Sequence, residues 1–551
     1  MFAVTIVLVL LLALVASTFV ARLLPWKLPL PLLQILIGAG LSEVIGFDIE
    51  FEPHLFLLLF IPPLLFLDGW RIPKGALFQN WRPILTMAIG LVVFTVAAMG
   101  YFIHWLLPAV PLAVAFALAA ILSPTDPVAV GAMTADSPLP SRLMHILEGE
   151  SLLNDATGLV CFSFAVAAVL TGSFSLAQAS LSFVVVAGGG VLTGLGVTWA
   201  IGRLNRVLVA RAGEEPGIQI LISLLIPFAA YLAGEHLHVS GILAAAVAGV
   251  AMHYVELSGP ALAVTRTQRS AVWDTVQIAL NGGIFLLLGA QLPTMIDALP
   301  AVAGGIGAAS PWNLLGYAGA LTLALGALRF TWVWLYHFVA SVPARLRGER
   351  HVMPHFRLLA IKATAGVRGA ITLAGILTLP LALQDSTPFP AREAVILLAM
   401  GVIIFSLLIA SVGLPLLTRG LKVDLQHAAH EDGEAVARIS ATEAAMRRIE
   451  EIVAEAAAAS GGASAYDEAG LQVLDLYRRR LDYGDHGGED LDSLLALMQA
   501  ERDLRLQALA AEREQLFRLR RSRSIDCNVL RKLVHEIDLL EISLSDAPGH
   551  G

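Results

Sequence analysis

The chain has 551 residues, of which 57% are hydrophobic and only 15% are charged, and its formal net charge is -8. A soluble domain is usually about a quarter charged, so this composition indicates that most of the chain needs a solvent other than water. Cys161 and Cys527 are the only cysteines, which excludes a disulfide framework or a zinc cluster.

Apolar runs recur from Met1 to about Leu421, each long enough to cross a hydrocarbon core about 30 Å thick. About thirteen spans are expected, at 3–20, 30–47, 54–70, 83–107, 111–135, 143–171, 176–202, 217–234, 239–255, 271–292, 313–340, 358–382 and 394–418. From Lys422 onward the chain is charged and has no further run of this length. The sequence therefore predicts an all-α polytopic membrane domain, residues 1–423, followed by a cytosolic helical tail, residues 424–551.

Basic residues alternate between the two sets of loops. The odd-numbered loops contain Arg22, Lys27, Arg71, Lys74, Arg82, Arg142, Arg203, Arg206, Arg211, Arg266, Arg269, Arg345, Arg347, Arg350 and Arg357, and the even-numbered loops contain only Arg392. Because short cytoplasmic loops carry an excess of Lys and Arg, we expect the N-terminus outside and the tail inside a bacterial-type inner membrane. The first apolar run lacks a basic leading region and a cleavage site, so it is expected to remain as a span.

Two of the expected spans are interrupted. In the fifth span Pro124 and Pro127 flank Asp126, and each proline leaves a backbone carbonyl without its helical donor. In the twelfth span, Gly366 and Gly369 interrupt the helix around Arg368. Broken helices in corresponding halves are typical of transporters built from inverted repeats, with a binding site near the bilayer midplane. We therefore expect two broken crossing helices.

The sixth expected span and its short lead-in carry several polar groups in an apolar stretch, among them Glu150, Ser151, Asn154 and Asp155. A charge at mid-membrane costs roughly 2.5–3.5 kcal/mol on insertion scales, so such groups are paired, protonated or bound to an ion. Ser151 and Asp155 are four residues apart and lie on one helix face. With Asn154 beside them, they present a hydroxyl, an amide and a carboxylate to one cavity.

These groups are hard oxygen donors, suited to a hard cation. With Asp126 and the carbonyls freed in the fifth span, they form a partial cage for Na⁺ or Li⁺. Burial favours the protonated carboxyl and a bound cation favours the carboxylate, so proton and cation would compete for one site. The residues leave K⁺ open as the cation. A cation channel, or a membrane enzyme or sensor with the tail as its output, also remains open.

Two arginines, Arg329 and Arg368, also fall within expected spans. A buried arginine needs a partner, because breaking a buried ion pair costs roughly 3–5 kcal/mol. Glu150 and Asp68 are the candidate carboxylates for these two arginines. No nucleotide-binding loop is found, so ATP-driven transport is not expected.

Three segments, SPTDPVAV, EGESLLNDATGLV and GVRGAITLA, occur in this order and spacing. Together they resemble the bacterial sodium/proton antiporters of the monovalent cation:proton antiporter-1 family, and the tail is similar to that of the long members. The resemblance implies secondary exchange of Na⁺ or Li⁺ for H⁺, with no cofactor and no nucleic-acid partner, and a part in pH homeostasis. It also implies a homodimer in lipid and an elevator-like movement of the ion-carrying helices.

The resemblance also implies roles for single residues. Asp155 would be the carboxylate that carries cation or proton, Thr125 would offer its main-chain carbonyl and Ser151 its hydroxyl. Asp126 would lie at or just behind the ion, and Asn154 would organise the site.

The remaining implications concern charge. Glu150 would pair with Arg329, and Asp68 is the nearest match to an acidic residue that the family often has near the ion. An Asn-Asp pair, here Asn154 and Asp155, is associated in this superfamily with electroneutral, one-for-one exchange.

Overall fold

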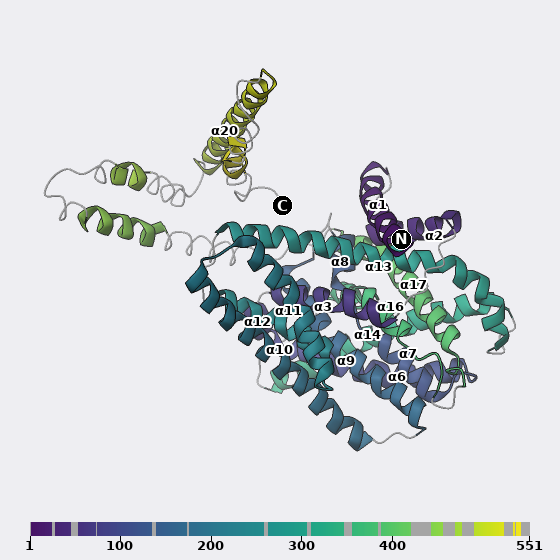
Figure 1. Ribbon diagram of the computed structural model, residues 1–551. Coiled ribbons are helices and arrows are strands. Elements are labelled where there is room, and N and C mark those ends of the chain that lie inside the picture. The colour runs from purple at the N-terminus through teal and green to yellow at the C-terminus, as the bar shows by residue number, and fades with distance from the viewer. Residues whose placement is uncertain are drawn as a thin grey trace. The chain divides into compact units, whose positions relative to one another are not determined.

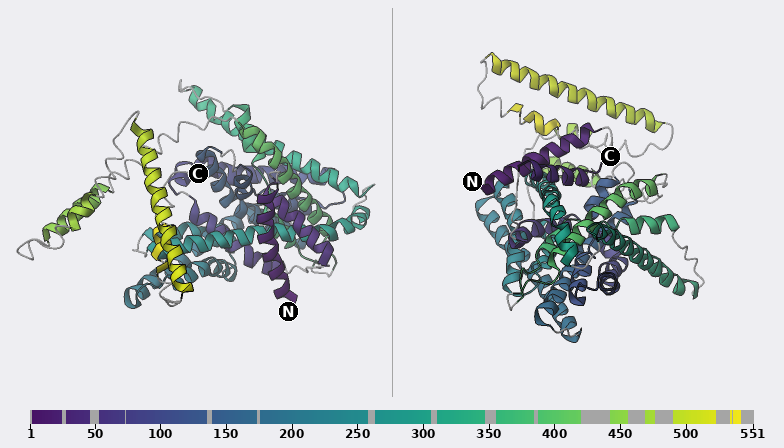
Figure 2. Two further views of the ribbon diagram at one scale, coloured as in Figure 1. Left: turned by 90° about the horizontal axis from the view of Figure 1, so that it is seen from above. Right: turned by 90° about the vertical axis from the view of Figure 1, so that its right-hand side faces the viewer.

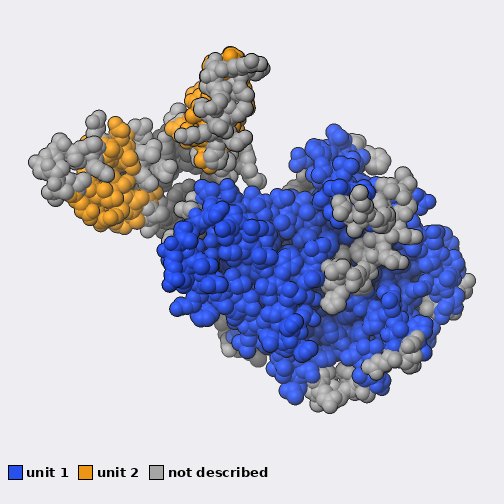
Figure 3. Space-filling model, in the orientation of Figure 1, with its two compact units in different colours: residues 1–422 blue, residues 423–551 orange. Residues whose placement is uncertain are grey.

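The computed structural model describes residues 2–24, 28–45, 53–72, 74–134, 139–172, 176–257, 263–305, 310–346, 355–383, 387–419, 442–455, 469–475, 490–522, 533–534 and 536–541. Lys27, Arg347, Arg350 and Cys527, which entered the sequence analysis, lie outside them. The chain forms two compact units, residues 1–422 and 423–551, coloured separately in Figure 3.

Unit 1 is mainly helical in its described residues. The exceptions are turns, short irregular segments such as 124–126 and 366–369, and one isolated bridge between Ala382 and Pro388. Its helices are α1 Phe2–Leu23, α2 Leu30–Ile45, α3 Pro53–Arg71, α4 Lys74–Gln79, α5 Trp81–Leu85, a π-helical turn η1 Thr86–Leu91, α6 Val92–Leu106, α7 Leu112–Ile121, α8 Pro127–Met133, α9 Ser141–Thr171, α10 Leu176–Ala212, α11 Pro216–His236, α12 Gly241–Leu257, α13 Ala263–Gly305, α14 Trp312–Leu346, α15 Phe356–Thr364, α16 Ala370–Leu377 and α17 Arg392–Thr418 (Figure 1).

Each expected span corresponds to one of these helices or to a run of shorter ones. Within the described residues, eight helices are long and apolar enough to cross a membrane, and shorter apolar helices accompany them. The predicted all-α, multi-span fold is thus confirmed. The fourth span differs from expectation, because it passes from α5 through the π-helical turn Thr86–Leu91 before α6 begins. The tenth is longer than expected, because α13 stays helical for 43 residues through Pro293 and Pro300.

Glycines bring one group of helices into direct backbone contact. A methyl group on Gly249 of α12 would lie 2.0 Å from the Phe66 carbonyl oxygen of α3, and one on Gly289 of α13 would lie 2.0 Å from the Ile35 oxygen of α2. Small residues allow such approach between membrane helices, where packing rather than the hydrophobic effect drives association. Helix α13 therefore packs closely against α2, and α3 against α12. Figure 2 shows the ribbon from two further sides.

The second group of helices in unit 1 contains both breaks. Helix α7 packs between α6 and α9, and α16 packs against α17. The residues of α7 from Ala117 to Ile121 are fully buried. This dense packing surrounds the points at which α7 gives way to α8 and α15 to α16.

Unit 2 is helical where it is described, as predicted for the tail. Its longest helix is α20, Asp490–Arg521, and residues 442–455 and 469–475 are also helical. Arg513 of α20 pairs with Asp538 at 2.8 Å and with Glu541, which connects α20 to the last described helical residues of the chain.

The Gly249 contact can be tested by adding one methyl group. We expect Gly249→Ala to lower the melting temperature of the purified protein in detergent, because overpacking a close contact costs about 1–3 kcal/mol. Gly196→Ala on α10 is the matched control, since a methyl group there meets nothing within 4 Å. Equal melting temperatures for the two variants would contradict the packing role of Gly249.

Candidate functional site

The first break separates α7 from α8. Pro127 opens α8 as its first residue, a position where the missing N–H costs nothing. Asp126 is the N-cap, and its Oδ1 accepts hydrogen bonds from the N–H groups of Val128 at 2.9 Å and Ala129 at 3.3 Å. A carboxylate at a helix N-terminus is favoured by the helix dipole. The sequence therefore places Asp126 at the start of a half-helix with one oxygen engaged.

The second break faces the first one. The Asp126 N–H donates to the Val367 carbonyl oxygen at 2.8 Å, so the two interrupted segments are joined through their backbones. A methyl group on Gly369 would lie 2.1 Å from Asp126 Oδ2. Residue 369 must therefore be glycine, because any side chain there would collide with the Asp126 carboxyl group.

Arg368 is buried between the two breaks and bonds to backbone rather than to a carboxylate. Its Nε donates to the Leu122 carbonyl oxygen at 2.8 Å, and its Nη1 donates to that of Gly366. Both acceptors lie where a helix is interrupted. The expectation that Arg368 pairs with Glu150 or Asp68 is wrong within the described residues, because carbonyl groups at the breaks take its guanidinium instead.

Helix α9 supplies the central polar face. Ser151, Asn154 and Asp155 are at most 4% exposed. The Asn154 amide nitrogen donates to the Thr125 hydroxyl oxygen at 3.0 Å, which ties α9 to the first break. For Thr125, the structure thus adds a side-chain contact to the main-chain role expected from the resemblance. Asn154 Oδ1 is buried without a hydrogen-bond partner within the described residues.

A cavity brings five of the expected residues together. It is lined by Asp68, Thr125, Asp126, Ser151 and Asp155, among others. The space open to the centre of a water molecule is about 40 Å³, and about 10–15 Å³ of such space holds one water. The cavity can therefore hold a few waters or a partly hydrated small ion. Asn154 lies behind Thr125 and is not part of the lining.

Three polar lining residues were missed by the sequence analysis: Gln277 and Asn281 of α13, and Thr372 of α16. Gln277 and Asn281 are four residues apart in an apolar span, the same spacing that drew attention to Ser151 and Asp155. The same spacing rule, applied to this span, would have predicted that Gln277 and Asn281 share one helix face. Nothing in the sequence indicates which span lines the same cavity as α9, so the part of the lining that they form could be found only from the structure.

A buried ion pair lies beside the cavity. Arg329 is 2% exposed and Glu150 is 1% exposed. Arg329 Nη2 donates to Glu150 Oε2 at 2.8 Å and its Nη1 to Oε1, while Arg329 Nε donates to the Lys362 carbonyl oxygen at 2.8 Å. This two-bond geometry is the strong form of an arginine–carboxylate pair, and it connects α9, α14 and α15.

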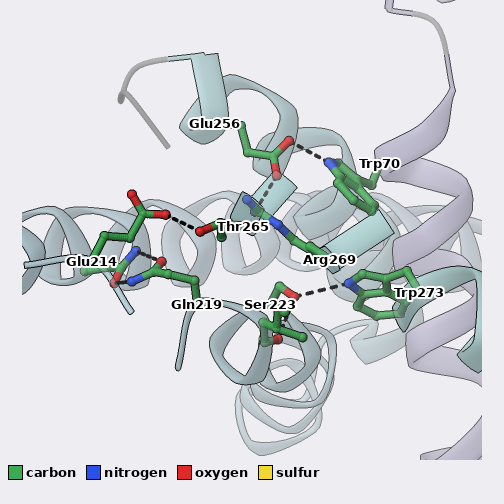
Figure 4. A network of polar contacts seen from close by, with 10 residues as sticks. Trp70, Glu214, Gln219, Ser223, Glu256, Thr265, Arg269 and Trp273 are labelled. Atoms are coloured by element: carbon green, nitrogen blue, oxygen red, sulfur yellow. Dashed lines mark hydrogen bonds and ion pairs between the residues drawn. The ribbon is translucent and has the colours of Figure 1, made fainter. Parts of the chain in front are cut away.

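A second polar network lies at the ends of α3, α11, α12 and α13 (Figure 4). Trp70 Nε1 donates to Glu256 Oε2 at 2.9 Å, and Arg269 pairs with the other oxygen of Glu256. Trp273 Nε1 donates to the Ser223 hydroxyl at 3.2 Å. Of these residues the sequence analysis named only Arg269, as a basic residue of a loop. Together they connect four helices of the group to which α13 belongs.

Three carboxyl groups in one small cavity define what the site can do. Asp68, Asp126 and Asp155 all line it, and like charges in a poorly hydrated space repel one another. Protons or a bound cation relieve that repulsion. Within the described residues, no His, Cys, Asp and Glu cluster of three or more has the geometry of a metal centre. Crossing broken helices around buried carboxylates are characteristic of a secondary transporter.

Residues 8–420 match the family described as sodium/hydrogen exchanger, transmembrane, and the chain belongs to this family. It is therefore a multi-pass membrane protein of a transporter family, and the resemblance found in the sequence is confirmed.

Named relatives match over most of the chain. The chain is 40% identical over 533 residues to the uncharacterized Na⁺/H⁺ exchanger YjcE of Escherichia coli, covering 96% of each protein. It is 37% identical to the sodium, potassium, lithium and rubidium/H⁺ antiporter of Bacillus subtilis, covering 97% of this chain and 78% of that protein. The sodium proton antiporter NhaP1 of Methanocaldococcus jannaschii has a similar fold, with a TM-score of 0.52 at 18% identity, covering 76% of this chain and 99% of that one.

The buried ion pair can be tested through folding. We expect Glu150→Ala to reduce the yield of folded protein sharply, because an uncompensated buried charge costs roughly 3–5 kcal/mol. The double variant Glu150→Leu with Arg329→Leu should recover much of that yield, since an apolar pair leaves no charge unpaired. Size-exclusion profiles of membrane extracts measure both.

The exposed pair Arg448–Glu451 offers a matched control. Glu451→Ala should leave the yield of folded protein unchanged, because exposed pairs contribute little. A normal profile for Glu150→Ala would show that the ion pair does not hold α9 to α14.

Proposed function

We propose that this protein is a secondary antiporter that exchanges Na⁺ or Li⁺ for H⁺, with cation and proton competing for Asp155. The observation that carries the proposal is the cavity in which Asp155, Asp126 and Ser151 meet at the crossing of two interrupted helices. The family and the names of the Escherichia coli and Bacillus subtilis relatives support the reaction.

The donor set supports an alkali cation. Carboxylate and hydroxyl oxygens are hard ligands, and the cavity contributes them from Asp155, Asp126, Asp68 and Ser151. The Thr125 main-chain carbonyl would add a neutral oxygen beside them. Asn154 would organise the site through its hydrogen bond to the Thr125 hydroxyl.

Competition for one carboxylate is enough to couple the two fluxes. An empty, unprotonated Asp155 would leave a charge in a nearly dry cavity, which is costly. The protein would therefore change conformation only with a proton or a cation bound. Asp126 has one oxygen engaged by α8, so Asp155 is the carboxyl group better able to exchange its ligand.

The remaining features of the proposal concern assembly and orientation. The alternation of Arg and Lys in the loops supports a cell membrane location with the N-terminus outside and unit 2 in the cytoplasm. The domain boundary would lie near residue 423. The Asn154–Asp155 pair supports electroneutral exchange, through the family resemblance. The same resemblance supports a homodimer.

Potassium is the second candidate cation. The Bacillus subtilis relative is named for sodium, potassium, lithium and rubidium, and oxygen ligands alone do not exclude a larger ion. A K⁺/H⁺ antiporter would use the same carboxylate and the same competition. A cation channel would use the cavity without proton release in proportion to cation uptake.

Replacing Asp155 tests the site directly. In everted vesicles with an acidified interior, we expect wild-type protein to restore the fluorescence of a proton-sensitive dye when Na⁺ or Li⁺ is added, and Asp155→Asn to lose this response while still inserting. Asp297→Asn is the matched control, because Asp297 is exposed on α13 and outside the cavity. Full exchange by Asp155→Asn would remove Asp155 from the mechanism.

Competition makes a separate prediction about pH. The half-saturating Na⁺ concentration should rise as the pH falls, by up to about tenfold per pH unit, because the cation binds only the deprotonated carboxylate. Dequenching measured with a series of Na⁺ concentrations at several pH values gives this dependence. A half-saturating concentration that does not change with pH would mean that proton and cation use different groups.

A further inference from the structure

The cavity has a wall that belongs to neither broken helix. Gln277 and Asn281 of α13 line it, opposite the α9 residues Ser151 and Asp155. They are four residues apart, so they stack on one face of α13. Both side chains reach the cavity that the three carboxyl groups line, whereas other positions of α13, such as Ile278, are exposed.

The two amides differ in what they are free to bind. Gln277 Oε1 accepts a hydrogen bond from Arg71 Nη1 at 2.6 Å, and Arg71 also pairs with Asp274, one turn earlier on α13. The oxygen of Gln277 is therefore engaged at the edge of the cavity. Gln277 thus helps to hold the end of α3 to α13.

Asn281 has no such partner. It is half-buried, it lines the cavity, and it makes no hydrogen bond with any other residue that the structure describes. Its amide is therefore free to bind water or an ion in the cavity. The amide oxygen is a hard, neutral donor of the kind that binds alkali and alkaline-earth cations.

The position of Asn281 is held firmly by its neighbours. A methyl group on the adjacent Gly282 would lie 2.1 Å from Leu14 Cδ1 of α1 and 2.8 Å from Gln34 Nε2 of α2. Gly289, two turns further on, meets the backbone of α2. A side chain on a closely packed helix cannot shift to fit ions of different radius, so it can distinguish cations by their size.

We propose that Asn281 binds the transported cation through Oδ1 and sets the preference among alkali cations. The inference deepens the proposed antiport function and rests on it. An amide does not titrate, so Asn281 changes the affinity for the cation without offering a second proton site. Because the attraction between an ion and an oxygen falls with distance, loss of this oxygen should weaken the binding of the small ions Li⁺ and Na⁺ more than that of K⁺ and Rb⁺.

The test compares cations rather than rates alone. Everted vesicles containing wild type, Asn281→Leu, Asn281→Asp or Asn205→Leu are titrated with LiCl, NaCl, KCl and RbCl, and the half-saturating concentration and the maximal dequenching are recorded. Asn281→Leu keeps the volume but removes the oxygen, and Asn281→Asp keeps an oxygen. Asn205, a half-buried amide on α10 bonded to Gln219, is the matched control.

We expect Asn281→Leu to raise the half-saturating Na⁺ and Li⁺ concentrations about tenfold and to raise those of K⁺ and Rb⁺ less. Asn281→Asp should retain the preference for the small ions, and Asn205→Leu should leave all four values unchanged. Equal shifts for all four cations, or none, would overturn the inference while leaving the antiport function intact.

A binding measurement covers the case of a variant that is folded but inactive. Cations that bind the folded state raise its melting temperature, so purified wild-type protein should melt higher in NaCl than in choline chloride. This difference should shrink in Asn281→Leu, and an undiminished difference would exclude Asn281 as a ligand. If wild type dequenches with none of the four cations, the antiport function fails, and this inference fails with it.

Discussion

The hydrogen bond from the Asp126 N–H to the Val367 carbonyl oxygen joins the two interrupted helices, and the site depends on it. Each break exposes backbone groups that a lipid interior cannot satisfy. Here the breaks satisfy one another, and Gly369 allows the contact because it has no side chain. The polar groups left over face a cavity instead of lipid, and this is where Asp155 and Ser151 lie.

Two buried arginines stabilise this region in different ways. Arg329 neutralises Glu150 with two hydrogen bonds and reaches the Lys362 carbonyl with a third group. Arg368 binds carbonyl oxygens on both sides of the crossing, at Leu122 and Gly366. One arginine thus offsets a formal charge, and the other offsets partial charges at broken helix ends. Neither arginine neutralises a carboxyl group that lines the cavity. These carboxyl groups therefore remain available to protons and cations.

Much of the fold could be predicted because apolar runs of about 20 residues are unambiguous, and proline and glycine mark the breaks. The polar face of α9 followed from a spacing of four residues between Ser151 and Asp155. The partners of Arg368 could not be predicted, because a sequence does not reveal which backbone carbonyls become free and turn inward. Asn281 was missed for a related reason, since long-range packing decides which helix faces α9.

Asp126 has two physical tasks that are usually divided between residues. One oxygen of its carboxyl group closes the first turn of α8, and the residue also lines the cavity. Any replacement at this position therefore changes the start of a half-helix and the charge lining the cavity at once. Asp155 lies within an unbroken helix and carries no such duty. Loss of activity on replacing residue 126 could thus come from the disturbed start of α8 or from the lost carboxyl group. The same loss on replacing residue 155 would come from the lost carboxyl group, because Asp155 caps no helix.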